Sequence, residues 1–188
     1  MKKIIFLFIA AGLSFSLHAQ KMAIKNNLVY DALLSPNLSV EMGINKQITL
    51  DISGNVNPME VSPNEYFKHW LVQPEVRYWF CERFNGTFVG FHLLGGGFDI
   101  AGSMFPLNSF KTFQEHRYNG YFWGGGLSIG HQWILGDRWG IEAAIGGGYA
   151  HLYQEKYECR ECTNLISKKY KDFLGPTKVS LSIVYMIR

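Results

Sequence analysis

Residues 69–80 read HWLVQPEVRYWF, and polar and apolar side chains alternate along this stretch. Its polar positions include Gln73, Glu75 and Arg77, and its apolar positions are Trp70, Val72, Pro74, Val76, Tyr78 and Phe80. Successive side chains of a β-strand point to opposite faces, so the pattern predicts a strand between two different environments. In a soluble sandwich the apolar face is the core, whereas in a membrane barrel it meets lipid and polar side chains fill the interior. The remainder of the chain has to distinguish the two.

The N-terminus carries a pattern typical of an export signal. A basic start at Met1-Lys2-Lys3 is followed by an apolar run over residues 4–17 and by His18-Ala19 before Gln20. The run is too short for a convincing transmembrane helix, and the small residues resemble a cleavage site. We therefore expect residues 1–19 to be a signal peptide and residues 20–188 to form one exported domain.

The composition excludes several classes of protein. The chain is 47% hydrophobic and 15% aromatic, yet its mean hydropathy is only -0.03, because apolar residues are spread along it. A formal charge of +3 without a basic run does not indicate a nucleic-acid-binding protein. No phosphate-loop or metal-ligand spacing is present, so we expect no cofactor and no metal site.

The same alternation recurs and predicts eight strands. Their approximate ranges are 24–33, 38–44, 48–56, 69–80, 87–100, 121–133, 139–153 and 177–188.

The lengths of the connections alternate as well. The links at 45–47, 81–86 and 134–138 are short, whereas those at 57–68, 101–120 and 154–176 are long and polar. Short periplasmic turns and long extracellular loops are typical of outer-membrane barrels, and only the short link at 35–37 departs from the pattern. The sequence thus predicts an all-β protein, an eight-stranded antiparallel up-and-down transmembrane β-barrel in the cell outer membrane, with outer-membrane lipid around it.

Aromatic residues occur at both ends of the predicted strands. One group lies at the periplasmic ends and a second toward the outer ends: Tyr78, Phe80, Trp133, Trp139 and Tyr185 in the first, and Trp70, Tyr121, Trp123 and Tyr149 in the second. Amphipathic rings favour the headgroup level of a bilayer, so the two rows agree with a membrane barrel.

The interior of a barrel this small is filled by side chains. The predicted inward positions carry charged residues: Asp31, Glu41, Asp51, Glu75 and Glu142 with Lys25, Arg77 and Lys178. Isolated charges away from water are costly, so we expect a structural salt-bridge network. A proton or ion path is the functional alternative.

Two features interrupt the regular pattern. Pro74 lies in mid-strand and lacks an N–H, so we expect a bulge or a widened hydrogen bond there. Glycine triplets at 95–97, 124–126 and 146–148 are interpreted as points of curvature, with a bare patch for lipid or a partner as the alternative.

The cysteines indicate a local disulfide. Cys159 and Cys162 form a C-x-x-C within a polar loop of an exported chain, so a disulfide between them is expected. A zinc site and redox chemistry remain weaker alternatives, and Cys81 is predicted at the opposite end of the barrel.

Four segments also carry a resemblance. They are KNNLVYDALLSPNLSVEMGI (25–44), HWLVQPEVRYWFCERFNG (69–86), GHQWIL (130–135) and GPTKVSLSIVYMIR (175–188). The chain resembles an uncharacterised family, a domain of unknown function, of small outer-membrane barrel proteins from Bacteroidota-type bacteria. The resemblance implies an outer-membrane barrel, and some relatives are encoded near fimbrial assembly genes.

Three functional classes follow. The first is a non-catalytic barrel whose outer loops engage a surface or fimbrial protein partner. The second is a lipid-modifying enzyme, for which Ser128 and His131 are candidates; at i and i+3, however, they point to opposite faces of a strand. The third is a soluble lipocalin-like barrel with an apolar cavity. We favour the first, which is not an enzyme, and the sequence does not determine the oligomeric state.

The third outer loop carries the candidate partner contacts. Residues 101–120 combine aromatic and basic side chains, a composition suited to protein contact, and the candidates are Phe105, Phe110, Phe113, Arg117 and Tyr118. The alternative is that these aromatics fold over the mouth of the barrel.

Overall fold

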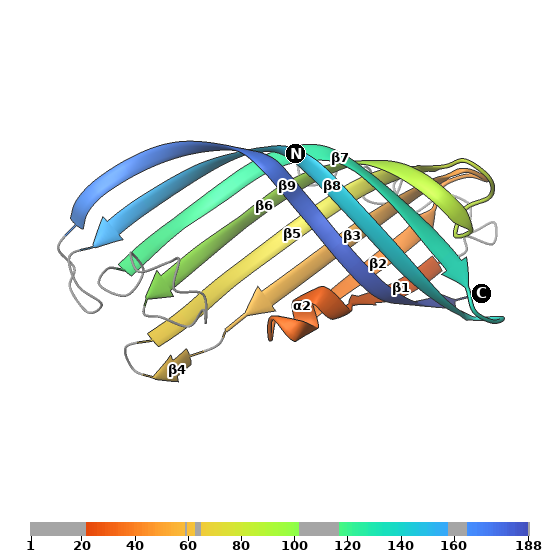
Figure 1. Cartoon of the computed structure of the whole chain (residues 1–188), viewed down its shortest axis with the longest axis horizontal. Coiled ribbons are helices and arrows are strands. Elements are labelled where there is room, and N and C mark those ends of the chain that lie inside the picture. Colours follow the sequence, from red (N-terminus) through yellow and green to blue (C-terminus); the bar gives the residue numbers. More distant parts are fainter. Residues whose placement is uncertain (1–21, 59, 63–64, 102–116, 158–164, 188) are drawn as a thin grey trace, which may run out of the picture.

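The computed structural model describes residues 22–58, 60–62, 65–101, 117–157 and 165–187 (Figure 1). These residues form nine strands and one short helix. The strands are β1 Met22–Asn27, β2 Asn37–Gly43, β3 Ile48–Asn57, β4 Glu60–Ser62, β5 Glu65–Trp79, β6 Gly86–Ala101, β7 Arg117–Ile134, β8 Trp139–Tyr157 and β9 Leu165–Ile187, and the helix is α2 Leu28–Ala32. Among the described residues, no helix has the length and apolarity needed to cross a bilayer.

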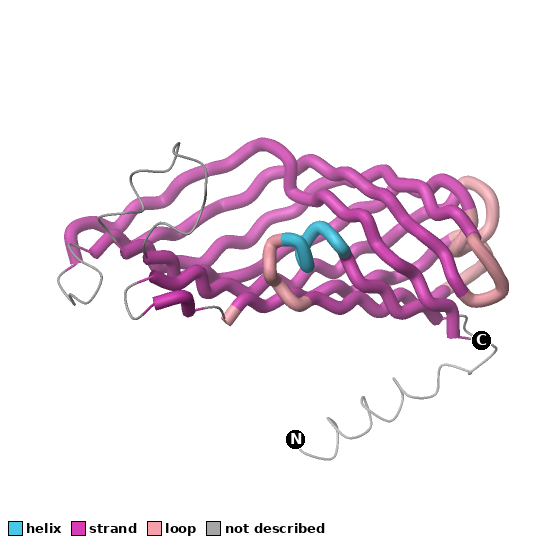
Figure 2. The backbone as a smooth tube through the Cα atoms, turned by 60° about the horizontal axis from the view of Figure 1, so that its bottom comes forward, coloured by secondary structure: helices cyan, strands magenta, loops and turns pink. Residues whose placement is uncertain are grey.

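The strands form one antiparallel sheet that closes on itself. Its order is β3-β2-β1-β9-β8-β7-β6-β5-β4, and a further pairing of β3 with β5 joins eight strands into a ring (Figure 2). The short strand β4 lies outside this ring and adds three residues beside the Glu65 end of β5. The all-β prediction is confirmed, as is the antiparallel order in which each long strand pairs with its neighbours along the chain.

The predicted first strand is wrong beyond Asn27. The Asn27 side chain accepts a hydrogen bond from the Val29 N–H at 3.1 Å and caps α2 instead of continuing the strand. The same side-chain oxygen accepts from the Leu181 N–H of β9 at 3.1 Å. The Leu181 N–H is thus bonded to the Asn27 side chain and not to the backbone of a longer β1. Strand β1 therefore ends after six residues.

Four strands are longer by four residues or more than predicted on the side of the long connections. Strand β5 begins at Glu65, β7 begins at Arg117, β8 continues to Tyr157, and β9 begins at Leu165. The predicted loop at 154–176 is therefore largely a β-ladder, in which Gln154 pairs with Lys169 and Leu152 with Lys171. The sequence did not predict this hairpin, because both of its faces meet solvent and polar residues interrupt the alternation there.

The ladder is interrupted at Pro74 and shifts its register at Thr177. Strands β5 and β6 keep one register on both sides of Pro74, although the pairs opposite Gln73 and Pro74 are missing. No bulge forms there, and the missing pairs agree with the alternative expectation, a widened hydrogen bond where proline has no N–H. The register shifts instead between Gly146 and Gly147, which pair with Lys178 and Pro176 and leave Thr177 as an additional residue on β9.

The central glycines permit close approach of β7 and β8. Gly126 pairs with Gly148, and a Cβ atom at Gly126 would lie 2.3 Å from the Gly147 carbonyl oxygen. Any larger residue there would push the strands apart, in keeping with the curvature interpretation.

The three short links lie at one end of the ring (Figure 1). They connect β2 to β3, β5 to β6, and β7 to β8, and β9 reaches the same end at Ile187. The other end carries the long connections, and there β5 to β9 extend past the ends of β1 to β3.

Candidate functional site

The outward surface of the ring is apolar. Large hydrophobic side chains remain exposed on the outward positions of the strands, with exposed fractions of 68% for Leu127 and 64% for Ile145. The others in the central band include Ile52, Val72, Val76, Val89, Phe91, Leu93, Ile129, Val179, Leu181 and Ile183. An exposed apolar surface of this extent marks an interaction with lipid or protein.

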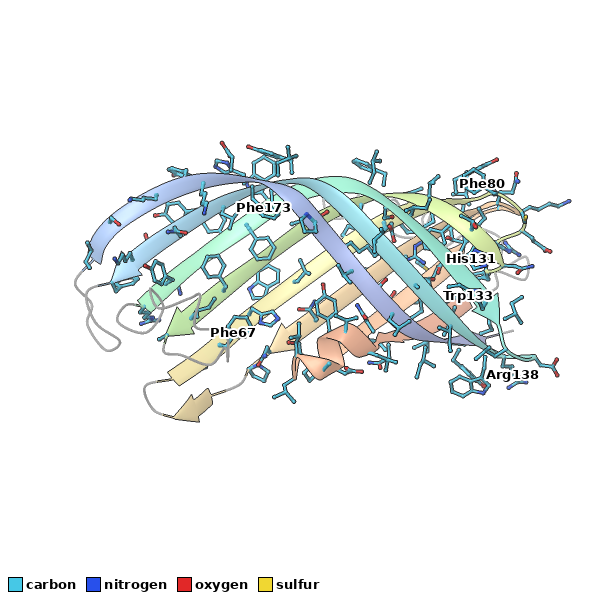
Figure 3. All side chains as sticks on the ribbon, viewed as in Figure 1. Phe67, Phe80, His131, Trp133, Arg138 and Phe173 are labelled. Atoms are coloured by element: carbon cyan, nitrogen blue, oxygen red, sulfur yellow. The ribbon has the colours of Figure 1, made fainter. Side chains whose placement is uncertain are left out.

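Aromatic side chains border this band on both sides. Near the short turns, Trp139 lies against Tyr185 with ring centroids 4.9 Å apart, and Phe80 and Trp133 lie at the same end (Figure 3). At the other border, Trp70 and Tyr121 both pair with Gly97, so they belong to one row across β5, β6 and β7. The separation of Trp139 from Tyr149 along β8 matches the ~9–11 residues of a tilted bilayer crossing.

Inside the ring, the register places three carboxylates in a row. Glu41 of β2 pairs with Asp51 of β3, and Asp51 pairs with Glu75 of β5. All three side chains are buried, and Glu41 is 0% exposed. Like charges directly opposite one another are destabilising, so this row requires cations beside it.

Arg77 supplies the central cation. Its Nε donates to Glu75 Oε2 at 2.6 Å, its Nη2 to Asp51 Oδ2 at 3.0 Å, and its Nη1 to Glu41 Oε2 at 3.0 Å and to Glu142 Oε2 at 2.9 Å. The guanidinium also lies 4.4 Å from the centre of the Phe88 ring. One buried side chain thus connects β2, β3, β5 and β8.

Two lysines complete the cluster. Lys25 Nζ donates to Glu142 Oε2 at 2.5 Å and forms an ion pair with Glu41, and Lys178 Nζ donates to Glu75 Oε2 at 2.5 Å. Hydroxyl groups occupy the second oxygen of three of the four carboxylates, since Ser39 donates to Asp51, Thr49 to Glu41 and Ser128 to Glu75. We call these seven charged residues, Lys25, Glu41, Asp51, Glu75, Arg77, Glu142 and Lys178, the charge cluster.

The charge cluster contains the predicted inward residues with one exception. Asp31 is exposed in α2, where its Oδ1 accepts from Asn37 Nδ2 at 2.8 Å. Its expected inward position is wrong because the chain leaves the sheet at Asn27. Sequence reasoning also missed Trp79, whose indole N–H donates to Thr49 Oγ1 at 2.9 Å. Its position two residues after Arg77 was a signal that it faces inward.

The candidate catalytic pair lies apart. The buried Ser128 hydroxyl donates to Glu75, whereas His131 Nδ1 lies 2.8 Å from Thr87 Oγ1, so their polar contacts involve different partners. His92 is paired differently: its Nε2 lies 2.9 Å from the Oγ1 of Thr177, the bulged residue.

The predicted loop contacts are only partly within the described residues. Arg117 forms a bidentate pair with Asp99 at 2.6 and 2.9 Å, and Tyr118 is buried on the inward side of β7. Phe105, Phe110 and Phe113 lie outside the described residues, as do Cys159 and Cys162. Cys81 is exposed in the link between β5 and β6.

Comparison with known protein families finds a match over nearly the whole chain. Residues 4–187 match a family described as a protein of unknown function (DUF3575). The chain belongs to this family. Searches of the curated proteins and of the solved structures find no match. The family covers nearly the whole chain and assigns it no activity, so a functional argument has to rest on the geometry above.

Proposed function

We propose that the ring is an eight-stranded β-barrel that spans the outer membrane. The observation that carries the proposal is the inverted polarity of the molecule, with Leu127 and Ile145 exposed outside while Glu41 and Arg77 are buried inside. A soluble sandwich or lipocalin-like barrel has the opposite arrangement, because water favours polar side chains on the outer surface. The two aromatic rows support the same reading, since they border the apolar band at both ends.

In this proposal the short turns face the periplasm and the long connections face outward, as in known outer-membrane barrels. The barrel is not an enzyme but a rigid scaffold that presents its outer connections to a surface or fimbrial protein. The charge cluster supports a scaffold role: its charges satisfy one another across β1, β2, β3, β5, β8 and β9. Binding residues commonly lie on loops held by such a scaffold.

The bilayer assignment can be tested with two matched substitutions. Ile145→Arg places a charge in the middle of the proposed lipid face and is expected to cost about 2–4 kcal/mol in a bilayer. Ile166→Arg alters an exposed residue of β9 beyond the aromatic rows and is expected to be silent. Stability is measured by urea unfolding of the protein refolded into lipid vesicles, alongside carbonate washing of the outer-membrane fraction.

The assignment fails if Ile145→Arg is as silent as Ile166→Arg, or if the wild-type protein is recovered in the soluble periplasmic fraction. Either result would favour a lipocalin-like barrel, whose exposed surface tolerates a new charge.

The partner role needs a separate experiment. Residues 104–116 are replaced by a Gly/Ser linker of equal length, and surface partners are recovered by crosslinking on intact cells. The control replaces the short link at 135–138 at the other end. We expect partners to be lost only in the first variant, with folding unchanged in both. A folded variant that retains every partner would remove this segment from the proposal.

A further inference from the structure

On the side of the long connections, the concave face of the ring forms an open pocket of about 740 Å³, called the cavity below. It lies on the concave side of β5 to β9, on the same side of the molecule as Phe67 and Phe173 in Figure 3. Its walls are mainly apolar, and include Leu71, Leu94, Phe98, Phe122, Leu152 and Phe173. Leu94 is buried, and the Phe98 and Phe122 rings stack with centroids 6.4 Å apart.

A membrane crossing does not require these apolar side chains. Tyr121 and Trp123 point outward on β7, yet Phe122 between them points into the cavity, so this part of the strand is apolar on both faces. Ligand pockets have volumes of ~300–1,000 Å³ and apolar walls with a few polar groups. The cavity therefore has the properties of a binding site.

The few polar groups in the cavity wall indicate what kind of molecule fits. Among the described residues of the wall, the cation is Lys171, whose side chain is exposed and forms no ion pair with any described residue. At the inner end, Thr177 is already engaged by His92. A cation beside an apolar wall favours an anionic head group with an apolar tail.

The cavity has room for a long alkyl chain. A methylene group occupies about the volume of a water molecule in the liquid, ~30 Å³, so a chain of about sixteen carbons fits within it.

We propose that this cavity binds a long-chain fatty acid, with the hydrocarbon along the concave face of β5 to β9 and the carboxylate at Lys171. The assignment adds a ligand to the scaffold proposed above. It does not depend on whether residues 104–116 recruit a partner.

The test uses the full-length protein in phosphatidylcholine nanodiscs and a photoactivatable diazirine analogue of palmitate. Irradiation is expected to label inward residues of β5 to β9, and unlabelled palmitate is expected to compete, whereas hexadecyltrimethylammonium is not. Crosslinked peptides are located by mass spectrometry. Labelling of outward residues such as Leu127 serves as an internal control that reports contact with the surrounding lipid.

Two variants and one control test the contribution of the Lys171 charge separately from that of the cavity volume. Lys171→Gln should weaken palmitate binding about tenfold, because a hydrogen-bonded ion pair with the carboxylate is lost. Lys169→Gln is the matched control, since Lys169 lies two residues away on β9 and is not part of the cavity wall. Leu152→Trp should reduce inward labelling, because the larger side chain narrows the cavity.

The proposal is overturned if only outward residues are labelled, or if Lys171→Gln and Lys169→Gln bind palmitate alike. Inward labelling that appears only after residues 104–116 are replaced by a Gly/Ser linker would also overturn it, because the chain itself would then occupy the cavity. If the fatty-acid proposal fails, outward residues are still labelled by the surrounding lipid. That result differs from the one expected if the protein does not enter a bilayer, in which outward labelling is lost as well.

Discussion

The two halves of the ring share an apolar exterior but have opposite interiors. Toward the short turns, eight strands enclose the charge cluster, and Arg77 alone contacts four carboxylates. Toward the long connections, β5 to β9 continue without β1 to β3, and their concave face is lined by apolar side chains such as Leu94 and Phe122.

This difference follows from closure of the ring. In the closed half, each polar group loses water and has to find a partner within the protein, so charges are held in a fully connected network. In the open half, an unpaired residue such as Lys171 keeps access to solvent at little cost. The closed half therefore determines stability, and the open half is free to carry a binding surface. The following predictions test that division, beginning with the largest expected effect.

Removing the central cation should have the largest effect. Arg77→Met keeps much of the side-chain volume but leaves four buried carboxylates with only Lys25 and Lys178 among the cations of the cluster. We expect a loss of about 3–5 kcal/mol in the free energy of unfolding, measured by urea titration in lipid vesicles.

Lys171→Met makes the same type of change in the open half, where it should cost less than about 0.5 kcal/mol. Equal costs for the two substitutions would contradict the division between the halves.

An intermediate effect is expected where the halves meet. Gly126 pairs with His92 on one side and Gly148 on the other, and an added Cβ atom would press on the β8 backbone. Gly126→Ala should therefore cost about 1–3 kcal/mol. Gly95→Ala is the control, because no atom lies within 4 Å of its added Cβ, and it should change stability by less than about 0.5 kcal/mol. Similar losses in both variants would indicate that close approach of β7 and β8 is not the reason for the glycines.

The smallest effect concerns the outer tip of the β8–β9 hairpin. Tyr153 donates a hydrogen bond to Glu155 at 2.6 Å, and this bond, with the neighbouring Lys168 and Tyr157, lowers the pKa of Glu155 to about 2. Because the pKa is lower in the folded state, the contribution of Glu155 is present above about pH 4.5 and is lost as the pH falls toward 2.

Hydrogen-exchange protection of residues 150–157, corrected for intrinsic rates, should fall less than about fivefold over that range, because solvent screens the partly exposed Glu155 carboxylate. Protection near Trp139 should not change. Glu155→Gln should abolish the pH dependence, and a dependence that persists in this variant would assign it to another group.

The sequence predicted which charged side chains point inward better than it predicted which of them pair with one another. Glu75 and Arg77 stand on the polar face of one alternating stretch, so their common orientation is a local property of the chain. Their contacts with Asp51 and Glu142 depend on register across β3 and β8, which no single stretch specifies. The cavity was not anticipated, because Phe122 and Leu94 break alternation and resemble ordinary strand residues until β5 to β9 curve around them.

By itself, the sequence determined the all-β class, the approximate positions of the long strands and the face to which most side chains point. It could do so because side-chain orientation in a strand has a period of two residues and requires no knowledge of the neighbours. Only the tertiary structure decided that Asn27 ends β1, that the register shifts at Thr177 and not at Pro74, and that four carboxylates meet at Arg77. Those outcomes depend on which strands pair and in which register, and closure of the ring sets both through contacts between residues far apart in the chain.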